Sequence, residues 1–270
     1  MDVVCVGDCG VDHYLPSHRR LSGGITANFA RHARKEFPAG DKIRIVSCVG
    51  NDDFAPFILS SLKDSGIGCH ISTLPGSTPV QYIEIEPNGE RRFVRYDEGV
   101  LRNFSFGREE RRIIAKSDLL VAPVYLQIVD LFDELMEIET DGRTAVDFAD
   151  FLQHPDFSLL ERHIDNIDIA FFGLSPGDEK TIARIAAVAA RYGKLFVVTL
   201  GASGSRAFAG NRRFDCSAVP VDKVVDTTGA GDAFAAGFLA SYCHGPDIPA
   251  AMQNGAKLAS TVVANIGSWS

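Results

Sequence analysis

The sequence lacks the patterns that mark several large classes of protein. Its six cysteines include no Cys-x-x-Cys pair, so a zinc site or a disulfide framework is not indicated. No apolar run reaches the roughly 18 residues that a membrane-spanning helix needs. The chain starts with an acid at position 2 and a short apolar run, unlike a secretory signal. We therefore expect a cytoplasmic protein without a membrane partner, whose cysteines are small apolar core residues: Cys5, Cys9, Cys48, Cys69, Cys216 and Cys243.

Positive charge is also scarce. The 27 Lys and Arg residues are outnumbered by 35 Asp and Glu residues, which gives a net charge of −8. Such a chain has no overall attraction to a polyphosphate, so we expect no nucleic-acid partner. Its 46% apolar residues can fill a core, and its 270 residues suit one large domain with a small appendage. A soluble globular protein is expected.

The two common phosphate-binding motifs are missing as well. No Gly-x4-Gly-Lys-Ser/Thr occurs, and no Gly-x-Gly-x-x-Gly follows the first apolar run, where residues 7–12 read Gly-Asp-Cys-Gly-Val-Asp. The P-loop and the dinucleotide-binding fold are both disfavoured.

What the chain does contain is a regular alternation of short apolar runs and longer periodic segments. Val, Ile and Leu runs followed by helical periodicity are typical of βαβ units with a parallel sheet covered on both faces. The pattern predicts strands at 3–6, 43–49, 118–122, 144–148, 167–172 and 195–199, and helices at 25–37, 54–62, 129–138, 179–191 and 235–242.

One region departs from this alternation. Residues 78–86 and 91–96 are rich in β-forming residues and flank Asn88 and Gly89, a strong signal for a hairpin turn. With residues 11–21 this hairpin is expected to form a small β lid over the sheet edge; the alternative is a plain edge hairpin without a function. Three arginines on the hairpin either bind an anionic substrate group or form a solvated strand face: Arg91, Arg92 and Arg95.

A glycine-rich turn precedes the helix at 235–242. Gly229 and Gly231 are expected to leave backbone N–H groups free at a helix N-terminus, which attracts an anion. Asp232 would lie beside that anion, where a general base is needed to take a proton from an attacking hydroxyl. The alternative is that Asp232 only complements the helix dipole.

Residues 226–232, which read Asp-Thr-Thr-Gly-Ala-Gly-Asp, resemble the C-terminal signature of ribokinase-type (PfkB) carbohydrate kinases. Residues 22–30 and 48–54 resemble the N-terminal Gly-Gly…Asn and Val-Gly-x-Asp segments of that family, in family order. The resemblance implies one kinase domain over 1–270, a ribokinase-like three-layer α/β/α sandwich, and a β lid formed by about 11–21 and 69–100. It also implies ATP, Mg²⁺ and, in many members, an activating K⁺.

Site residues follow from the same resemblance. Asp232 would be the base, and the backbone of Gly229, Ala230 and Gly231 would form the anion hole. Alternative roles for the sugar-site residues are a turn cap, a helix start or a solvated helix face. The residues expected to bind the sugar are Asp12, Gly23, Gly24, Asn28 and Tyr96.

The resemblance also assigns the nucleotide and cation sites. Ser175 and Asp178 stand where the family has Asn-x-x-Glu and would hold Mg²⁺ through water, unless Glu179 serves instead or the pair only caps a helix. Asp226 and Thr228 resemble the monovalent-cation site. Nucleotide contacts are expected from Thr199, Gly201, Gly204, Asn254 and Ala256.

Within the family, the chain is similar to fructoselysine 6-kinases in residues 96–99 and 267–269. That similarity implies transfer of the ATP γ-phosphate to a fructosamine-type sugar. The alternatives are a kinase for fructose, ribose, a sugar acid or adenosine, and a non-catalytic relative that binds sugar or nucleotide. Exposed lid edges would allow a homodimer through the lid.

Overall fold

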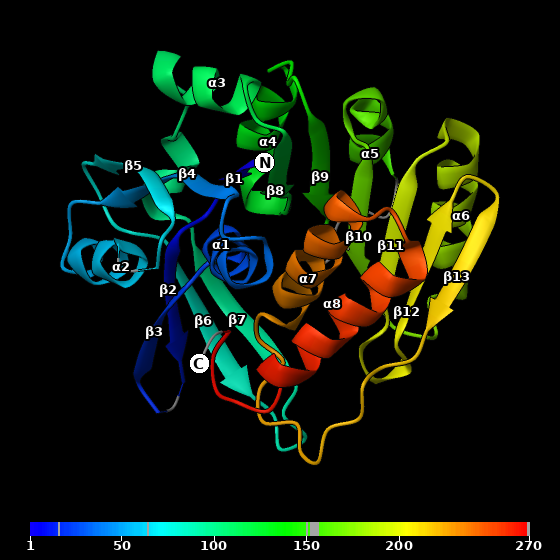
Figure 1. The fold of residues 1–270 in the computed structure, drawn as a ribbon. Helices are drawn as coiled ribbons and strands as arrows, with labels where there is room; N and C mark the ends of the chain where they lie inside the picture. The colour runs from blue at the N-terminus through cyan, green and yellow to red at the C-terminus, as the bar shows by residue number, and fades with distance from the viewer. Residues whose placement is uncertain (16, 64, 150, 152–156, 269–270) are drawn as a thin grey trace.

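The computed structural model describes residues 1–15, 17–63, 65–149, 151 and 157–268. Within them lie a nine-stranded sheet, in the order β13-β12-β11-β10-β9-β8-β1-β4-β5, and a separate four-stranded sheet, in the order β3-β2-β6-β7 (Figure 1). The strands of the large sheet are β1 (Asp2–Val6), β4 (Lys42–Gly50), β5 (Gly68–Leu74), β8 (Leu119–Pro123), β9 (Arg143–Asp147), β10 (Ile169–Gly173), β11 (Leu195–Thr199), β12 (Ser205–Ala209) and β13 (Arg212–Cys216). The small sheet holds β2 (Gly10–Tyr14), β3 (Arg19–Gly23), β6 (Val80–Ile85) and β7 (Arg91–Asp97).

Helices cover both faces of the large sheet. Along β1, Val3 and Cys5 face one hydrophobic core while Val4 and Val6 face the other, as strand alternation requires. Figure 1 shows helices of the first face in front of the sheet. That face carries α1 (Ile25–Glu36), α2 (Phe54–Lys63), α7 (Ala230–His244) and α8 (Ile248–Val262); the other carries α3 (Arg108–Ala115), α4 (Val129–Met136), α5 (Ser158–Arg162) and α6 (Glu179–Tyr192). The expected three-layer α/β/α sandwich is confirmed.

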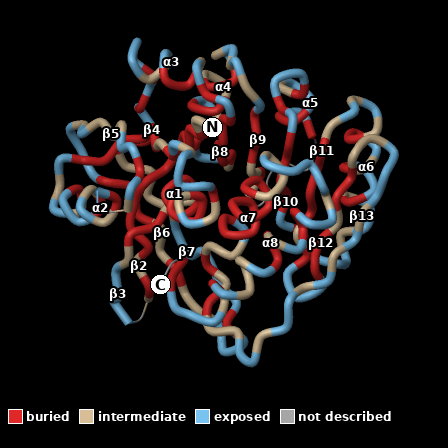
Figure 2. Tube along the Cα trace, in the orientation of Figure 1, coloured by how far each residue is buried: buried red, intermediate tan, exposed pale blue. Residues whose placement is uncertain are grey.

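The large sheet is parallel from β5 to β11, and β12 and β13 extend it as an antiparallel edge that the sequence analysis did not predict. Parallel strands are buried on both faces, which explains their continuous apolar runs. Figure 2 shows this burial along the central strands and α7.

The small sheet contains both segments expected to form the lid, with β2 parallel to β6 and antiparallel to β3. The hairpin turn is present, and Gly89 has a φ of 85°, a conformation that favours glycine. The expected lid range of 69–100 is wrong at its start, because residues 68–74 form β5 and pair with β4 in the large sheet. This edge strand has no fully buried residue, and its sequence, Gly-Cys-His-Ile-Ser-Thr-Leu, contains no continuous apolar run that would predict a strand of the large sheet.

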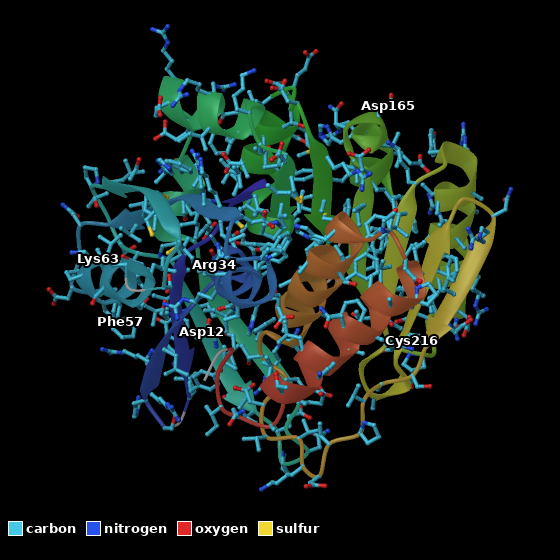
Figure 3. All side chains as sticks on the ribbon, viewed as in Figure 1. Asp12, Arg34, Phe57, Lys63, Asp165 and Cys216 are labelled. Carbon is cyan, nitrogen blue, oxygen red and sulfur yellow. The ribbon has the colours of Figure 1, made fainter. Side chains whose placement is uncertain are left out.

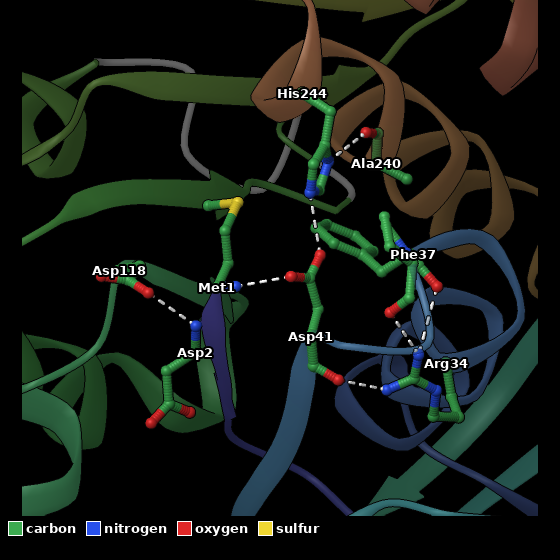
Figure 4. A network of polar contacts seen from close by, with 9 residues as sticks. Met1, Asp2, Arg34, Phe37, Asp41, Asp118, Ala240 and His244 are labelled. Atoms are coloured by element: carbon green, nitrogen blue, oxygen red, sulfur yellow. Dashed lines mark hydrogen bonds and ion pairs between the residues drawn. The ribbon is translucent and has the colours of Figure 1, made fainter.

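A polar network ties the opposite end of the large sheet together, where β1 and β4 begin (Figure 4). The Asp41 carboxylate accepts a hydrogen bond from the amino group of Met1 and contacts His244 Nε2 at 2.9 Å. Arg34 donates to the backbone oxygen of Asp41 at 2.6 Å. The network thereby joins α1 and α7 to the starts of β1 and β4, at the end far from the strands' carboxyl termini.

All six cysteines are free. Cys5, Cys9 and Cys48 are buried, as expected for core residues, and burial raises the pKa of each thiol. Cys69 is exposed, so the expectation of a core position is wrong there. No helix in the described ranges is long and apolar enough to cross a membrane.

Candidate active site

The predicted sugar and phosphate residues meet at the carboxyl ends of β1, β8 and β9. These strands are neighbours in the large sheet, and β2 leaves β1 after only three residues, so the small sheet starts at this edge. Asp12, labelled in Figure 3, lies on β2 at this junction. Ligands of open α/β sheets bind at the carboxyl edge of the strands.

Asp8, in the turn between β1 and β2, holds the start of α1. Gly24 is the N-cap of that helix and has no side chain to cap it. The Asp8 carboxylate instead accepts hydrogen bonds from the backbone N–H groups of Ile25 and Thr26, each at 3.1 Å. The glycine at 24 is needed because its φ is 100° and a Cβ would lie 2.9 Å from the backbone oxygen of Asp8. The sequence analysis missed Asp8.

Asp12 and Gly23 form a close pair across β2 and β3. A Cβ on Gly23 would lie 2.2 Å from Cγ of Asp12, so only glycine leaves room for this carboxyl group. Asp12 is 4% exposed, and its Oδ2 atom has no hydrogen-bond partner. Burial, with smaller contributions from Asp8 and Asp226, raises the pKa of Asp12 to about 7. A buried oxygen without a partner is suited to accept a hydrogen bond from a ligand hydroxyl.

Replacement of Asp12 is expected to affect the sugar and spare the nucleotide. In Asp12→Ala the KM for the sugar should rise at least about tenfold, because a hydrogen bond to a charged group is lost, while the KM for ATP stays within about twofold. Steady-state kinetics with each substrate varied in turn measures both. Asp215→Ala, on the distant β13, is the control. An unchanged sugar KM in Asp12→Ala would remove this residue from the site.

The predicted anion hole lies at the N-terminus of α7, where the N–H of Ala230 donates to the backbone oxygen of Thr227 at 3.3 Å. Gly229 is its N-cap with a φ of 79°, and a Cβ there would lie 2.3 Å from Cβ of Ser268. Gly231 is exposed and has open space around it, so an anion can approach its backbone. The two glycines therefore differ. Backbone conformation and packing require glycine at position 229, whereas the open space around Gly231 leaves its backbone accessible to an anion.

Asp232 follows in the first turn of α7 and is 7% exposed. Its Oδ2 atom accepts a hydrogen bond of 2.9 Å from Nδ2 of Asn28 on α1. Burial raises the pKa of Asp232 well above its ordinary value, and the nearby charge of Asp147 adds to this effect, whereas the bond from Asn28 lowers it. A carboxyl group with a raised pKa, held at a helix N-terminus, is suited to accept a proton from a substrate hydroxyl.

Asp147, at the carboxyl end of β9, is a further site residue that the sequence analysis missed. Burial raises its pKa to about 6, and Arg91 opposes that rise. The signal in the sequence was its place at the end of a predicted buried strand, the position from which α/β enzymes take their functional residues.

Tyr96 of β7 lies at the boundary of the two sheets. Its hydroxyl is 3.0 Å from the hydroxyl of Tyr125, in the loop that follows β8. Tyr125 also interacts with the Asp8 side chain. The predicted sugar residue Tyr96 is thus connected to the residue that caps α1.

The small sheet also contacts the glycine-rich loop directly. The guanidinium of Arg91 donates to the backbone oxygen of Thr227 at 3.1 Å, and the N–H of Thr227 donates to the backbone oxygen of Gly89. Tyr14 of β2 donates from its hydroxyl to Asp226 at 2.7 Å. Of the three hairpin arginines, Arg92 pairs with Glu84 and Arg95 with Asp97 on the strand surface.

The residues expected to contact the nucleotide lie on two elements. Thr199 ends β11, and Gly201 and Gly204 bound the loop that follows; Gly201 has open space around it, whereas a Cβ on Gly204 would lie 2.1 Å from the backbone oxygen of Cys216. Asn254 and Ala256 lie on α8. The amide of Asn254 donates to the backbone oxygen of Gly237 at 2.9 Å, so it already joins α8 to α7, and its contact with the nucleotide remains a prediction.

The residues predicted to bind a monovalent cation and those predicted to bind Mg²⁺ lie in different surroundings. Asp226 is fully buried, and its oxygens accept from Tyr14, Gly267 and the N–H of Thr228. The hydroxyl of Thr228 is buried beside Tyr14, and its contact with a monovalent cation remains a prediction. Ser175 and Asp178 close a turn before α6 through the bond from Ser175 N to Asp178 Oδ2.

No group of three or more His, Cys, Asp or Glu residues gathers as a metal-ligand set within the described ranges. Mg²⁺ at Ser175 and Asp178 would therefore depend mainly on nucleotide phosphates and water, the usual arrangement for this ion. Glu179, the alternative ligand, pairs with Arg206.

Comparison with known proteins identifies the family of the chain. A family model described as pfkB family carbohydrate kinase matches residues 2–270. The chain is 32% identical over 266 residues to fructoselysine 6-kinase of Shigella flexneri, covering 98% of each chain, and 29% identical over 274 residues to fructosamine kinase FrlD of Bacillus subtilis (strain 168), covering 100% of this chain and 93% of the relative. The crystal structure of adenosine kinase from Sinorhizobium meliloti has the same fold, with a TM-score of 0.84 at 23% identity over 100% of this chain and 95% of that one. The chain belongs to the pfkB family of carbohydrate kinases and is an ATP-dependent sugar kinase.

Proposed function

We propose that this kinase transfers the γ-phosphate of ATP to a hydroxyl of a fructosamine, a sugar that carries an amino acid on a secondary amine. The observation that carries the proposal is the similarity to a fructoselysine 6-kinase at 32% identity over 98% of both chains. The charge of the site supports it independently.

Carboxyl groups outnumber basic groups around the sugar position. The charge of Asp8 raises the pKa of Asp12 and of Asp232, and the charge of Asp147 also raises that of Asp232. Arg91 opposes the rise for Asp12, Asp147 and Asp232. A protonated secondary amine entering this site would relieve the repulsion between carboxylates. A sugar acid would increase it, which weighs against that alternative.

In the proposed reaction, Asp232 accepts the proton of the attacking hydroxyl. The hydroxyl oxygen forms a bond to the γ-phosphorus, and the bond between that phosphorus and the bridging oxygen breaks to release ADP. The backbone N–H groups of Gly229 and Gly231 at the start of α7 stabilise the negative charge on the phosphoryl oxygens. Mg²⁺, when bound with the nucleotide, supplies further positive charge to those oxygens.

The test is ATP-dependent ADP release with Mg²⁺ across a substrate panel. Fructoselysine and fructose share the ring and differ by the lysine, which brings the charged secondary amine, so they form the decisive pair for the fructosamine class. Ribose, 2-keto-3-deoxygluconate and adenosine complete the panel. We expect kcat/KM for fructoselysine to exceed that for fructose at least about a hundredfold, the effect of one well-placed ion pair. A preference for another acceptor would leave the kinase activity established and reject a fructosamine as the substrate.

We also propose that a monovalent cation binds at Asp226 and Thr228. Parallel assays in KCl and NaCl test this.

We also propose that two copies of the chain form a homodimer through the small sheet. β7 is an edge strand on which Phe93 is 53% and Val94 44% exposed. Exposed apolar side chains on an unpaired edge favour pairing with a second copy. Sedimentation of the wild type against Phe93→Glu tests the association.

A further inference from the structure

The segment at residues 263–268 packs on the loop at residues 225–229, which leads into α7. Its Ser268 side chain is linked to the proposed base, Asp232, through the side chain of Asn28. The backbone oxygen of Val263 accepts from the N–H of Val225, and the N–H of Gly267 donates to Asp226 at 2.8 Å. These bonds hold the segment beside the loop that begins α7.

Ser268 occupies a socket with three sides. Its hydroxyl donates to Oδ1 of Asn28 at 2.6 Å, and its backbone oxygen lies 2.8 Å from Nε2 of His32. Asn28 and His32 are four residues apart on α1, so they share a helix face. The third side is Gly229, which has no Cβ to occupy the position of the Ser268 side chain.

Every polar group in this socket is buried. The exposed fractions are 1% for Ser268, 3% for Asn28, 3% for His32 and 7% for Asp232. Burial lowers the pKa of His32, which favours a neutral ring. Since the Ser268 backbone oxygen can only accept, Nε2 of His32 carries the proton.

The Asn28 amide is held between the Ser268 hydroxyl and the Asp232 carboxylate. An amide can rotate by 180° and exchange its oxygen and nitrogen. The NH₂ group faces Asp232 because a carboxylate oxygen only accepts, and it donates there to Oδ2. The Ser268 hydroxyl, which can donate or accept, donates to the buried Oδ1 atom and so holds the amide in this orientation. The reversed amide would place oxygen against carboxylate oxygen, which repels the charged form of the base.

We propose that Ser268 is a positioning residue for phosphoryl transfer, acting through Asn28 to hold Asp232 in its orientation and to favour its charged form. The inference rests on the proposed role of Asp232 as the base. It gives residues 263–268 a part in catalysis separate from contact with either substrate.

Other charged groups also act on Asp232. Asp147 of β9 and Asp8 of the turn after β1 disfavour its charged form, and Arg91 of β7 favours it. None of the three belongs to the socket, so a change at Ser268 should leave them in place and alter only the contribution of Asn28.

The test is Ser268→Ala, with Ser260→Ala as a matched control because the Ser260 hydroxyl donates to Lys257 on the exposed side of α8. The Asp232 carboxyl is titrated by NMR in protein labelled with ¹³C-aspartate, and its signal is assigned from Asp232→Asn. We expect the pKa of Asp232 to rise by about one unit in Ser268→Ala, since a bond that favours the carboxylate is lost. The acidic limb of the kcat pH profile should move to higher pH by the same amount, with both KM values within about twofold.

A double mutant separates a relay from simple packing. If Ser268 acts through Asn28, the pKa in Asn28→Ala/Ser268→Ala should equal that in Asn28→Ala. Additive shifts, or an unmoved pKa in a folded Ser268→Ala protein, would overturn the proposal. Ser268→Cys, which keeps a weak donor, is used if the alanine variant does not fold; it should give a smaller shift in the same direction. The titration needs no substrate, so it decides this point even if Asp232→Asn shows that the base is another residue.

Discussion

Asp232→Asn should lower kcat at least about a hundredfold and leave the KM for ATP within a few fold. The asparagine side chain has nearly the same shape but accepts no proton from the sugar hydroxyl. The anion hole should survive, because it is built from the backbone of residues 229–231 and not from the carboxylate. Steady-state kinetics over a range of ATP concentrations measures the two parameters separately.

The control for this substitution is Asp222→Asn, in the exposed segment that leads to the same loop. It removes the same charge without touching the buried site, and turnover should remain near the wild-type value. Near-normal turnover in Asp232→Asn would show that another group accepts the proton, and Asp147 would then be the next residue to change.

Gly229→Ala should destabilise the protein and disable the site together. The residue has a φ of 79°, so any Cβ adds about 1 kcal/mol of backbone strain. Here the new Cβ would also overlap Ser268, and relief of that overlap by moving the 263–268 segment should cost about a further 1–3 kcal/mol. Since the displaced serine orients Asn28, we expect kcat to fall at least about tenfold as well.

Gly193→Ala separates the two costs. Gly193 ends α6 with a φ of 66°, and no atom lies within 4 Å of the position its Cβ would take. It therefore carries the backbone strain alone. Urea denaturation of both variants measures the difference in the free energy of unfolding. An equal loss of unfolding free energy in the two proteins, with full activity in Gly229→Ala, would mean that Ser268 can move without affecting stability or catalysis.

Much of the site was predicted because the residues at each position are chemically restrictive. Asp232 follows two glycines at a helix start, and this local pattern already indicates an anion site beside a base. The α/β/α sandwich was also predicted from local patterns, because continuous apolar runs that alternate with helical periodicity are compatible with few other folds.

Long-range contacts were beyond the reach of such patterns. Residues 69–74 were assigned to the lid because their sequence does not distinguish pairing with β4 from pairing in the small sheet. Asp8 and Asp147 are ordinary residues in the sequence, and their raised pKa values arise only where three strand ends converge.

The sequence by itself determined the layered fold and the glycine-rich helix start at which Asp232 lies, because each depends on residues that are neighbours along the chain. Only the tertiary structure decided what surrounds the base. The link from Ser268 through Asn28 to Asp232 spans 240 residues in its first bond and 204 in its second. Hydrogen bonds of that separation depend on how α1, α7 and the 263–268 segment pack together, which no local pattern specifies.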